Sequence, residues 1–190
     1  MTTMILGLVL FFVAHSLKVA RKVRMSLLER MGENLYKGVY SAVSLVGLIL
    51  IGFGFADYQS SGKILIWVPP FWMKHMALLL NWIALVFFAA AYLPCHIRRT
   101  LKHPMLAGII ILAATHLLTN GDMGGMILFG AFLLWAVVVR INVRSRPVDG
   151  NPPRASMPFD LLALVAGSVS YAVIVFWLHP AVFRIPVWPG

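Results

Sequence analysis

Residues 105–118, MLAGIIILAATHLL, form an apolar run in which His116 is the single ionisable side chain. Lys102 precedes the run, and the polar residues Asn-Gly-Asp at 120–122 follow it. An ionisable side chain inside a membrane span is costly, so it marks a functional site by default and needs a partner. His15 has a comparable setting in the first apolar run of the chain. Two predicted helices therefore each offer an imidazole to a buried metal cofactor.

The composition of the chain is that of an integral membrane protein. The 190 residues are 61% apolar and 12% charged, with a mean hydropathy of +0.87, which is far from the composition of soluble domains. A spanning helix needs about 20 apolar residues. The chain therefore predicts an all-α, polytopic transmembrane bundle of about six helices in a single integral-membrane domain, residues 1–190. The six apolar segments, of which the first, fourth and fifth are short for a full span, are residues 4–17, 36–56, 72–93, 105–118, 124–139 and 159–178.

The basic residues are distributed unequally between the two sides of this predicted bundle. Thirteen of the sixteen lysines and arginines follow the first, third and fifth segments, and only Lys63, Lys74 and Arg184 fall on the other side. The positive-inside rule therefore places both termini outside the cytoplasm. No polar stretch is long enough to form a nucleic-acid module, so the net charge of +10 indicates the lipid bilayer as the partner and no nucleic acid.

The types of donor atom favour haem over zinc or di-iron. Cys95 is the only cysteine, and the carboxylates near the spans lie at segment ends, whereas zinc needs several nearby Cys, His or carboxylate ligands. A haem with two axial imidazoles needs two histidines on facing helices. The alternative interpretation, for His15 and His116 alike, is an imidazole that is hydrogen-bonded to a backbone carbonyl or a nearby hydroxyl.

Depth in the membrane leaves the ligand pair open. His103 precedes Pro104 at the start of the fourth segment, on the side where the first segment ends. His116 is thirteen residues further, or about 20 Å along a helix, so depth alone pairs His15 more easily with His103. We prefer His15 and His116 as the axial ligands, because a buried imidazole has few other partners. His103 is kept as an alternative ligand or a supporting residue.

Further charged and imidazole side chains lie around these candidates. A haem carries anionic propionates, for which Arg98, Arg99 and Lys102 are candidate contacts. The remaining histidines lie near segment ends or in a loop, where a histidine is ordinarily solvated and has no special role; they are His75, His96 and His179.

Four motifs occur in the same order as in a known family. They are GLVLFFVAHS at 7–16, YKGVYS at 36–41, KHPM at 102–105 and ATHLLTNGD at 114–122. Over about residues 4–145, ahead of the last predicted helix at 159–178, the chain resembles the NnrU family of multi-pass membrane proteins, which includes the plant 15-cis-zeta-carotene isomerase. The resemblance implies a haem b protein with His15 and His116 as axial ligands. The plant isomerase has a cysteine three residues before the second histidine, whereas this chain has Ala113, so a thiolate ligand is not expected.

The resemblance also implies a function, with alternatives. The expected function is that of a b-type haem protein of the bacterial inner membrane, associated with nitrite and nitric oxide metabolism in denitrification. One alternative is a haem-dependent cis-trans isomerase of a carotenoid-like polyene. The expected small-molecule ligand is a nitrogen oxide under the first function and an apolar polyene under this alternative. Another is a membrane methyltransferase, because residues 102–105 are similar to the Arg-His-Pro motif of such enzymes, but no acid follows Arg140 before Asp149. The last is an assembly factor without chemistry.

Overall fold

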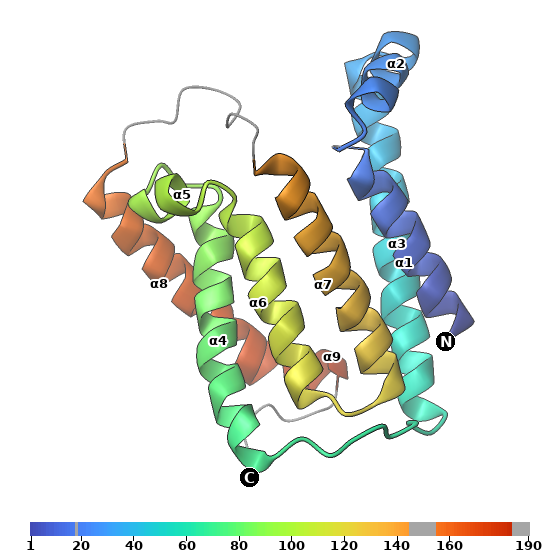
Figure 1. The fold of residues 1–190 in the computed structure, drawn as a ribbon, viewed down its shortest axis with the longest axis vertical. Helices are drawn as coiled ribbons and strands as arrows, with labels where there is room; N and C mark the ends of the chain where they lie inside the picture. Colours follow the sequence, from blue (N-terminus) through green and yellow to red (C-terminus); the bar gives the residue numbers. More distant parts are fainter. Residues whose placement is uncertain (18, 145–154, 184–190) are drawn as a thin grey trace.

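The chain folds into a bundle of α-helices, which confirms the predicted fold class (Figure 1). The computed structural model describes residues 1–17, 19–144 and 155–183. Each of the six predicted apolar segments forms a helix, and two short helices, α2 and α5, lie in the basic loops. The elements are α1 (Thr2–Ser16), α2 (Arg21–Met31), α3 (Glu33–Ser60), α4 (Phe71–Ala90), α5 (His96–Leu101), α6 (Pro104–Thr119), α7 (Met123–Val143), α8 (Met157–Val173), the π-helical turn η1 (Ile174–Leu178) and α9 (His179–Phe183).

The helices pack in an order that differs from their order along the chain. α1 packs against α3, α6 lies between α4 and α7, and α4 also packs against α8. The pair α1 and α3 contacts the rest of the bundle through α7. The α1–α3 pair therefore lies beside α7, and the order from α7 onward is α7, α6, α4 and α8, as Figure 1 shows. α7 is the helix that both candidate ligand helices, α1 and α6, touch.

Helix length follows the apolar pattern with one exception. Among the described residues, four helices are long and apolar enough to cross a membrane: α3, α4, α7 and the continuous helix Met157–Ala181. α1 has 15 residues and α6 has 16, so both are short, as predicted. α7 is longer than predicted because it continues past Arg140 to Val143. An arginine can bury its aliphatic stem and still hold its charge at the surface. The apolar run alone therefore underestimates the length of α7.

The two ends of the bundle differ in charge. α2, α5 and the end of α7 lie together at one end (Figure 1), which we call the basic end. The loop of residues 61–70 and the turn at 120–122 lie at the opposite end (Figure 1). The described basic residues of the basic end are Arg21, Lys22, Arg24, Arg30, Lys37, Arg98, Arg99, Lys102, Arg140 and Arg144.

Glycines set the close approach of α1 to α3. A Cβ built on Gly7 would lie 2.6 Å from the backbone nitrogen of Ile51, and a Cβ on Gly47 would lie 2.9 Å from that of Phe11. A Cβ on Gly54 would collide with the backbone of Met4. Small residues let backbones approach in this way when helices pack in a membrane. The glycine-rich sequence of α3 predicts this contact.

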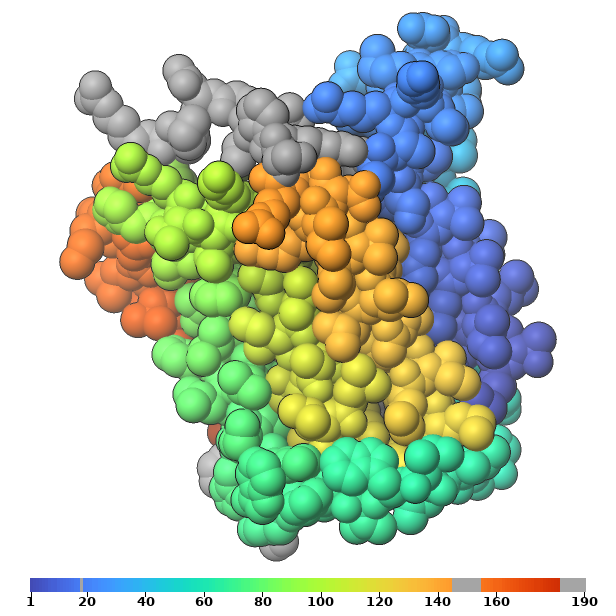
Figure 2. Space-filling model, in the orientation of Figure 1, coloured from blue at the N-terminus to red at the C-terminus, as the bar shows by residue number. Residues whose placement is uncertain are grey.

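A strap of extended chain closes the opposite end of the bundle. Residues 61–70 run across the ends of α6 and α7 (Figure 2). Backbone nitrogens of Ile66 and Trp67 donate to the carbonyl of Gly121, at 2.7 and 3.1 Å, and Met123 donates to the carbonyl of Ile64 at 2.9 Å. A Cβ on Gly121 would collide with the Trp67 carbonyl. The glycine at position 121 is therefore needed for this closure.

Asp122 links the strap to α7 as its N-cap. The carboxylate Oδ1 accepts a hydrogen bond of 2.9 Å from the backbone nitrogen of Gly125, and the side chain is buried. We expect Asp122→Ala to lower the free energy of unfolding by about 1 kcal/mol or more, because it leaves a buried N–H group unsatisfied. Asp122→Asn keeps a side-chain oxygen that accepts this hydrogen bond. We therefore expect it to lower the free energy of unfolding by only a few tenths of the loss in Asp122→Ala. Thermal unfolding in detergent measures both, and an equal loss in the two variants would contradict the capping role.

Candidate functional site

His15 lies in the last turn of α1 with its ring fixed from two sides. Its Nδ1 donates to the carbonyl oxygen of Phe11, one turn earlier, at 2.9 Å. The ring stacks on the Phe11 ring with a centroid distance of 3.9 Å and an angle of 20°. The rings of Tyr40 of α3 and Trp135 of α7 also border it, with centroid distances of 5.4 and 6.0 Å to the His15 ring. Three helices therefore hold this imidazole.

His116 lies in the last turn of α6 and repeats this arrangement. Its Nδ1 donates to the carbonyl oxygen of Leu112, again one turn earlier, at 2.8 Å. The ring stacks on Phe129 of α7 with a centroid distance of 4.2 Å and an angle of 26°. Helical side chains lean toward the helix N-terminus, which brings each ring near the carbonyl four residues before it.

The two hydrogen bonds select one tautomer for both rings. A neutral imidazole carries one N–H donor and one lone-pair nitrogen, so donation from Nδ1 leaves the lone pair on Nε2. Histidines that bind metals usually donate their other N–H to a carbonyl or carboxylate in this way. The same hydrogen bonds also fit the alternative interpretation, in which each histidine is bonded only to the backbone. Each ring therefore has the free lone pair that a metal ligand needs, but these hydrogen bonds alone do not make it a ligand.

Contacts with α7 give the relative depth of the histidines. His15 borders Trp135 and His116 borders Phe129, six residues apart, or about 9 Å along a helix. The backbone of Val143 lies within interaction range of the His103 ring, and Val143 is eight residues from Trp135, or about 12 Å along a helix. Measured along α7, the separation between His15 and His116 is therefore no larger than that between His15 and His103. The choice between His103 and His116 as the partner of His15 therefore stays a prediction.

An aromatic cluster connects α1 to α7 beside His15. The ring of Phe12 packs against those of Phe132 and Trp135, with centroid distances of 5.0 and 5.6 Å. The ring of Phe11 packs against that of Phe132, with a centroid distance of 5.6 Å. The indole Nε1 of Trp135 donates to the hydroxyl of Ser16 at 3.2 Å. These side chains surround the imidazole with apolar surface. The sequence does not predict the contacts of Phe129, Phe132 and Trp135, because aromatic residues on an apolar helix give no signal of their neighbours.

His103 is the N-cap residue of α6 at the basic end. Its carbonyl accepts from Arg140 at 3.2 Å, and its Nε2 is buried without a hydrogen-bond partner among the described residues. Burial lowers the pKa of His103, and the charges of Arg140 and Lys102 lower it further, while the hydrogen bond to Val143 raises it. The net lowering of this pKa favours the neutral form of His103, which a metal ligand or a hydrogen-bond acceptor requires.

The predicted propionate contacts lie near His103 and not near His15. Arg98 and Arg99 belong to α5, and Lys102 follows it with a positive φ of 59°. α5 packs against α4, α6 and α8. Among the described basic residues, Arg21 and Lys22 of α2 are the closest in sequence to His15, so α2 offers a second set of cations at the same end.

The other histidines have partners that the sequence did not predict. His96 pairs with Asp160 of α8 at 2.5 Å, and His75 packs edge-on against Phe71 at 5.1 Å. His179 lies within electrostatic range of His116. Within the described part of the chain, no three His, Cys, Asp or Glu side chains gather as a metal-binding group.

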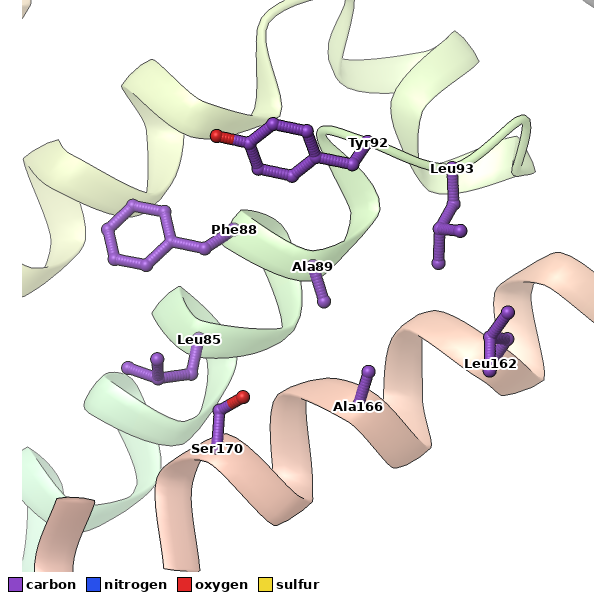
Figure 3. A pocket seen from close by; sticks show the side chains of 8 residues that line it. All are labelled: Leu85, Phe88, Ala89, Tyr92, Leu93, Leu162, Ala166 and Ser170. Carbon is purple, nitrogen blue, oxygen red and sulfur yellow. The ribbon is translucent and has the colours of Figure 1, made fainter. Parts of the chain in front are cut away.

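An apolar groove lies beside α4, and no histidine is among the residues that line it. It has a volume of about 460 Å³ and runs between α4 and α8, with Tyr92 and Leu93 near the basic end and Ser170 deeper along α8 (Figure 3). Its walls are aromatic and aliphatic (Figure 3). The groove can hold a hydrocarbon chain and includes neither His15 nor His116.

Comparisons with known proteins identify one family. No curated protein and no solved structure matches the chain. The family model described as NnrU protein matches residues 3–187. This match covers nearly the whole chain, including the last helix, which follows the motifs quoted above. The chain belongs to the NnrU family.

Proposed function

We propose that this protein is a membrane-embedded b-type haem protein with His15 and His116 as its axial ligands. The observation that supports the proposal best is the matching pair of hydrogen bonds from Nδ1 to the preceding turn, at 2.9 and 2.8 Å. Both bonds make Nε2 the basic nitrogen, which is the one that binds iron in this tautomer. Both rings also pack against α7, from different helices.

The surrounding residues have separate tasks in this proposal. The carbonyls of Phe11 and Leu112 hold the two rings in orientation, and the aromatic side chains of Phe129 and Trp135 keep water away. Cations at the basic end, including Arg98, Arg99 and Lys102, are available to anionic groups. A bound haem b would supply an iron that exchanges one electron or binds a small ligand. His103 is the rival ligand, because its buried Nε2 has no hydrogen-bond partner among the described residues.

We further propose that the protein acts in nitrite and nitric oxide metabolism, as a redox or sensing partner of the enzymes of denitrification. This role rests on family membership. The basic end is proposed to face the cytoplasm of a bacterial inner membrane, since α2 and α5 concentrate positive charge there. The helix ends near His116 then face the outer side.

The test of the haem proposal is an absorption spectrum of the purified, full-length protein. After expression with adequate haem, we expect a Soret band in the oxidised protein and a b-type α band after reduction. A protein that is folded, as judged by circular dichroism, but has neither band would overturn the proposal. His75→Ala serves as the matched histidine control, because His75 is exposed and lies at the opposite end.

The apolar groove between α4 and α8 favours a second candidate function, the cis-trans isomerisation of a carotenoid-like polyene. Its volume of about 460 Å³ and its hydrocarbon walls suit part of such a chain. It includes neither candidate ligand, so we rank this function second. Incubation of the reduced protein with poly-cis carotene, followed by chromatography, tests it; unchanged isomer composition would contradict it.

A further inference from the structure

His96 and Asp160 form a polar pair where α5 meets the start of α8. The Nδ1 atom of His96 lies 2.5 Å from Oδ2 of Asp160. The other carboxylate oxygen, Oδ1, accepts from the backbone nitrogen of Ile97 at 3.2 Å. The two residues are 64 positions apart in the chain. Asp160 therefore uses one oxygen to join α5 to α8 and the other to orient an imidazole.

This pairing gives His96 a defined chemical character. The carboxylate accepts a hydrogen bond from the N–H group at Nδ1, so in the neutral ring the lone pair is on Nε2. The His96 side chain is 51% exposed and that of Asp160 is 21% exposed. The pair is thus accessible to a ligand, and Nε2 of His96 is suited to accept a hydrogen bond.

The pair borders a pocket of about 600 Å³ between α4, α5 and α8. Phe87, Leu101 and Met157 form its apolar walls, and Thr100 adds a hydroxyl group. α5 lies at the basic end of the bundle (Figure 1), where α4 ends and α8 begins. One pocket thus combines hydrocarbon contacts with a polar pair at the basic end.

We propose that this pocket binds a membrane amphiphile through a hydroxyl group of its headgroup. The hydroxyl donates to Nε2 of His96, and the hydrocarbon chain of the ligand lies against Phe87, Leu101 and Met157. A neutral hydroxyl suits the site better than a phosphate oxygen, because the carboxylate of Asp160 repels an anion beside it. A quinol and a phospholipid with a glycerol headgroup share this chemistry. None of His15, His103 and His116 lines this pocket.

The experiment measures binding to the full-length protein in nanodiscs of a zwitterionic lipid without headgroup hydroxyls. The probes are a short-chain quinol, the dimethyl ether of the same quinol and a short-chain phosphatidylglycerol, titrated by calorimetry. The wild-type protein is expected to bind the quinol or phosphatidylglycerol, and to bind the quinol about tenfold more tightly than its ether if the quinol is the ligand. Phosphatidylglycerol binding alone assigns the site to a phospholipid, and quinol binding alone assigns it to a quinol. Binding of neither, or equal binding of quinol and ether without phosphatidylglycerol binding, would overturn the proposal.

Asp160→Asn provides the sharpest variant. The asparagine can still accept from Ile97, but its amide group donates to Nδ1 of His96 and so moves the ring proton to Nε2. The ring then donates where it previously accepted, and we expect the preference for the hydroxyl probe to disappear. An Asp160→Asn protein that folds and keeps the wild-type preference would contradict the proposal. His96→Ala changes a half-exposed side chain, and about tenfold weaker binding of the hydroxyl probe is expected for it.

Discussion

Replacing Gly54 with leucine is expected to unfold the α1–α3 pair. A Cβ at this position would collide with the backbone of Met4, and backbone cannot move aside as a flexible side chain can. We expect the free energy of unfolding to fall by about 3 kcal/mol or more, at the upper end of the cost of overpacking. The measurement is the thermal unfolding midpoint in detergent, together with the yield of monodisperse protein.

Gly52→Leu is the matched control for this prediction. Gly52 is on the same helix, two residues away, and a Cβ there would have no neighbour within 4 Å. The same change of residue is therefore expected to alter the free energy of unfolding by no more than about 0.5 kcal/mol. Equal effects at the two positions would mean that helix propensity, and not the contact with α1, determines the result.

His116→Ala and His15→Ala are each expected to abolish stoichiometric haem binding, whereas His103→Ala retains it. Removal of an axial ligand is expected to weaken haem binding by about tenfold or more, at least as much as removal of a group that supports a ligand. The haem content of each purified variant, measured as the pyridine haemochromogen and divided by the protein concentration, gives the result. His75→Ala controls for the loss of an arbitrary histidine.

Two outcomes of this series would change the ligand assignment. Loss of haem in His103→Ala with retention in His116→Ala would make His15 and His103 the pair. Retention in all three single variants would remove histidine ligation from these positions altogether. Circular dichroism of each variant separates loss of the ligand from loss of the fold.

The helical architecture could be predicted from the sequence because apolar runs of this length have few other solutions in a membrane. The short apolar runs likewise predicted that α1 and α6 are short helices. The same reasoning underestimated α7, since Arg140 interrupts the apolar run without ending the helix. It also missed the strap of residues 61–70, whose hydrogen bonds to Gly121 join segments far apart in sequence.

The candidate site could be predicted only at the level of its polar residues. His15 and His116 were found because an imidazole is conspicuous in an apolar segment. Their stacking partners Phe11 and Phe129 could not be found, because one aromatic residue among many apolar ones carries no positional signal. His96 was expected to be an ordinary solvated histidine, and its pairing with Asp160 depends on packing between α5 and α8 that no local pattern encodes.

The electron paramagnetic resonance spectrum of the ferric wild-type protein tests the central claim most directly. Two axial imidazoles from α1 and α6 predict a low-spin ferric haem signal, because imidazole on both faces gives a strong ligand field. A spectrum without a haem signal, or with a high-spin signal alone, would contradict ligation by the pair His15 and His116.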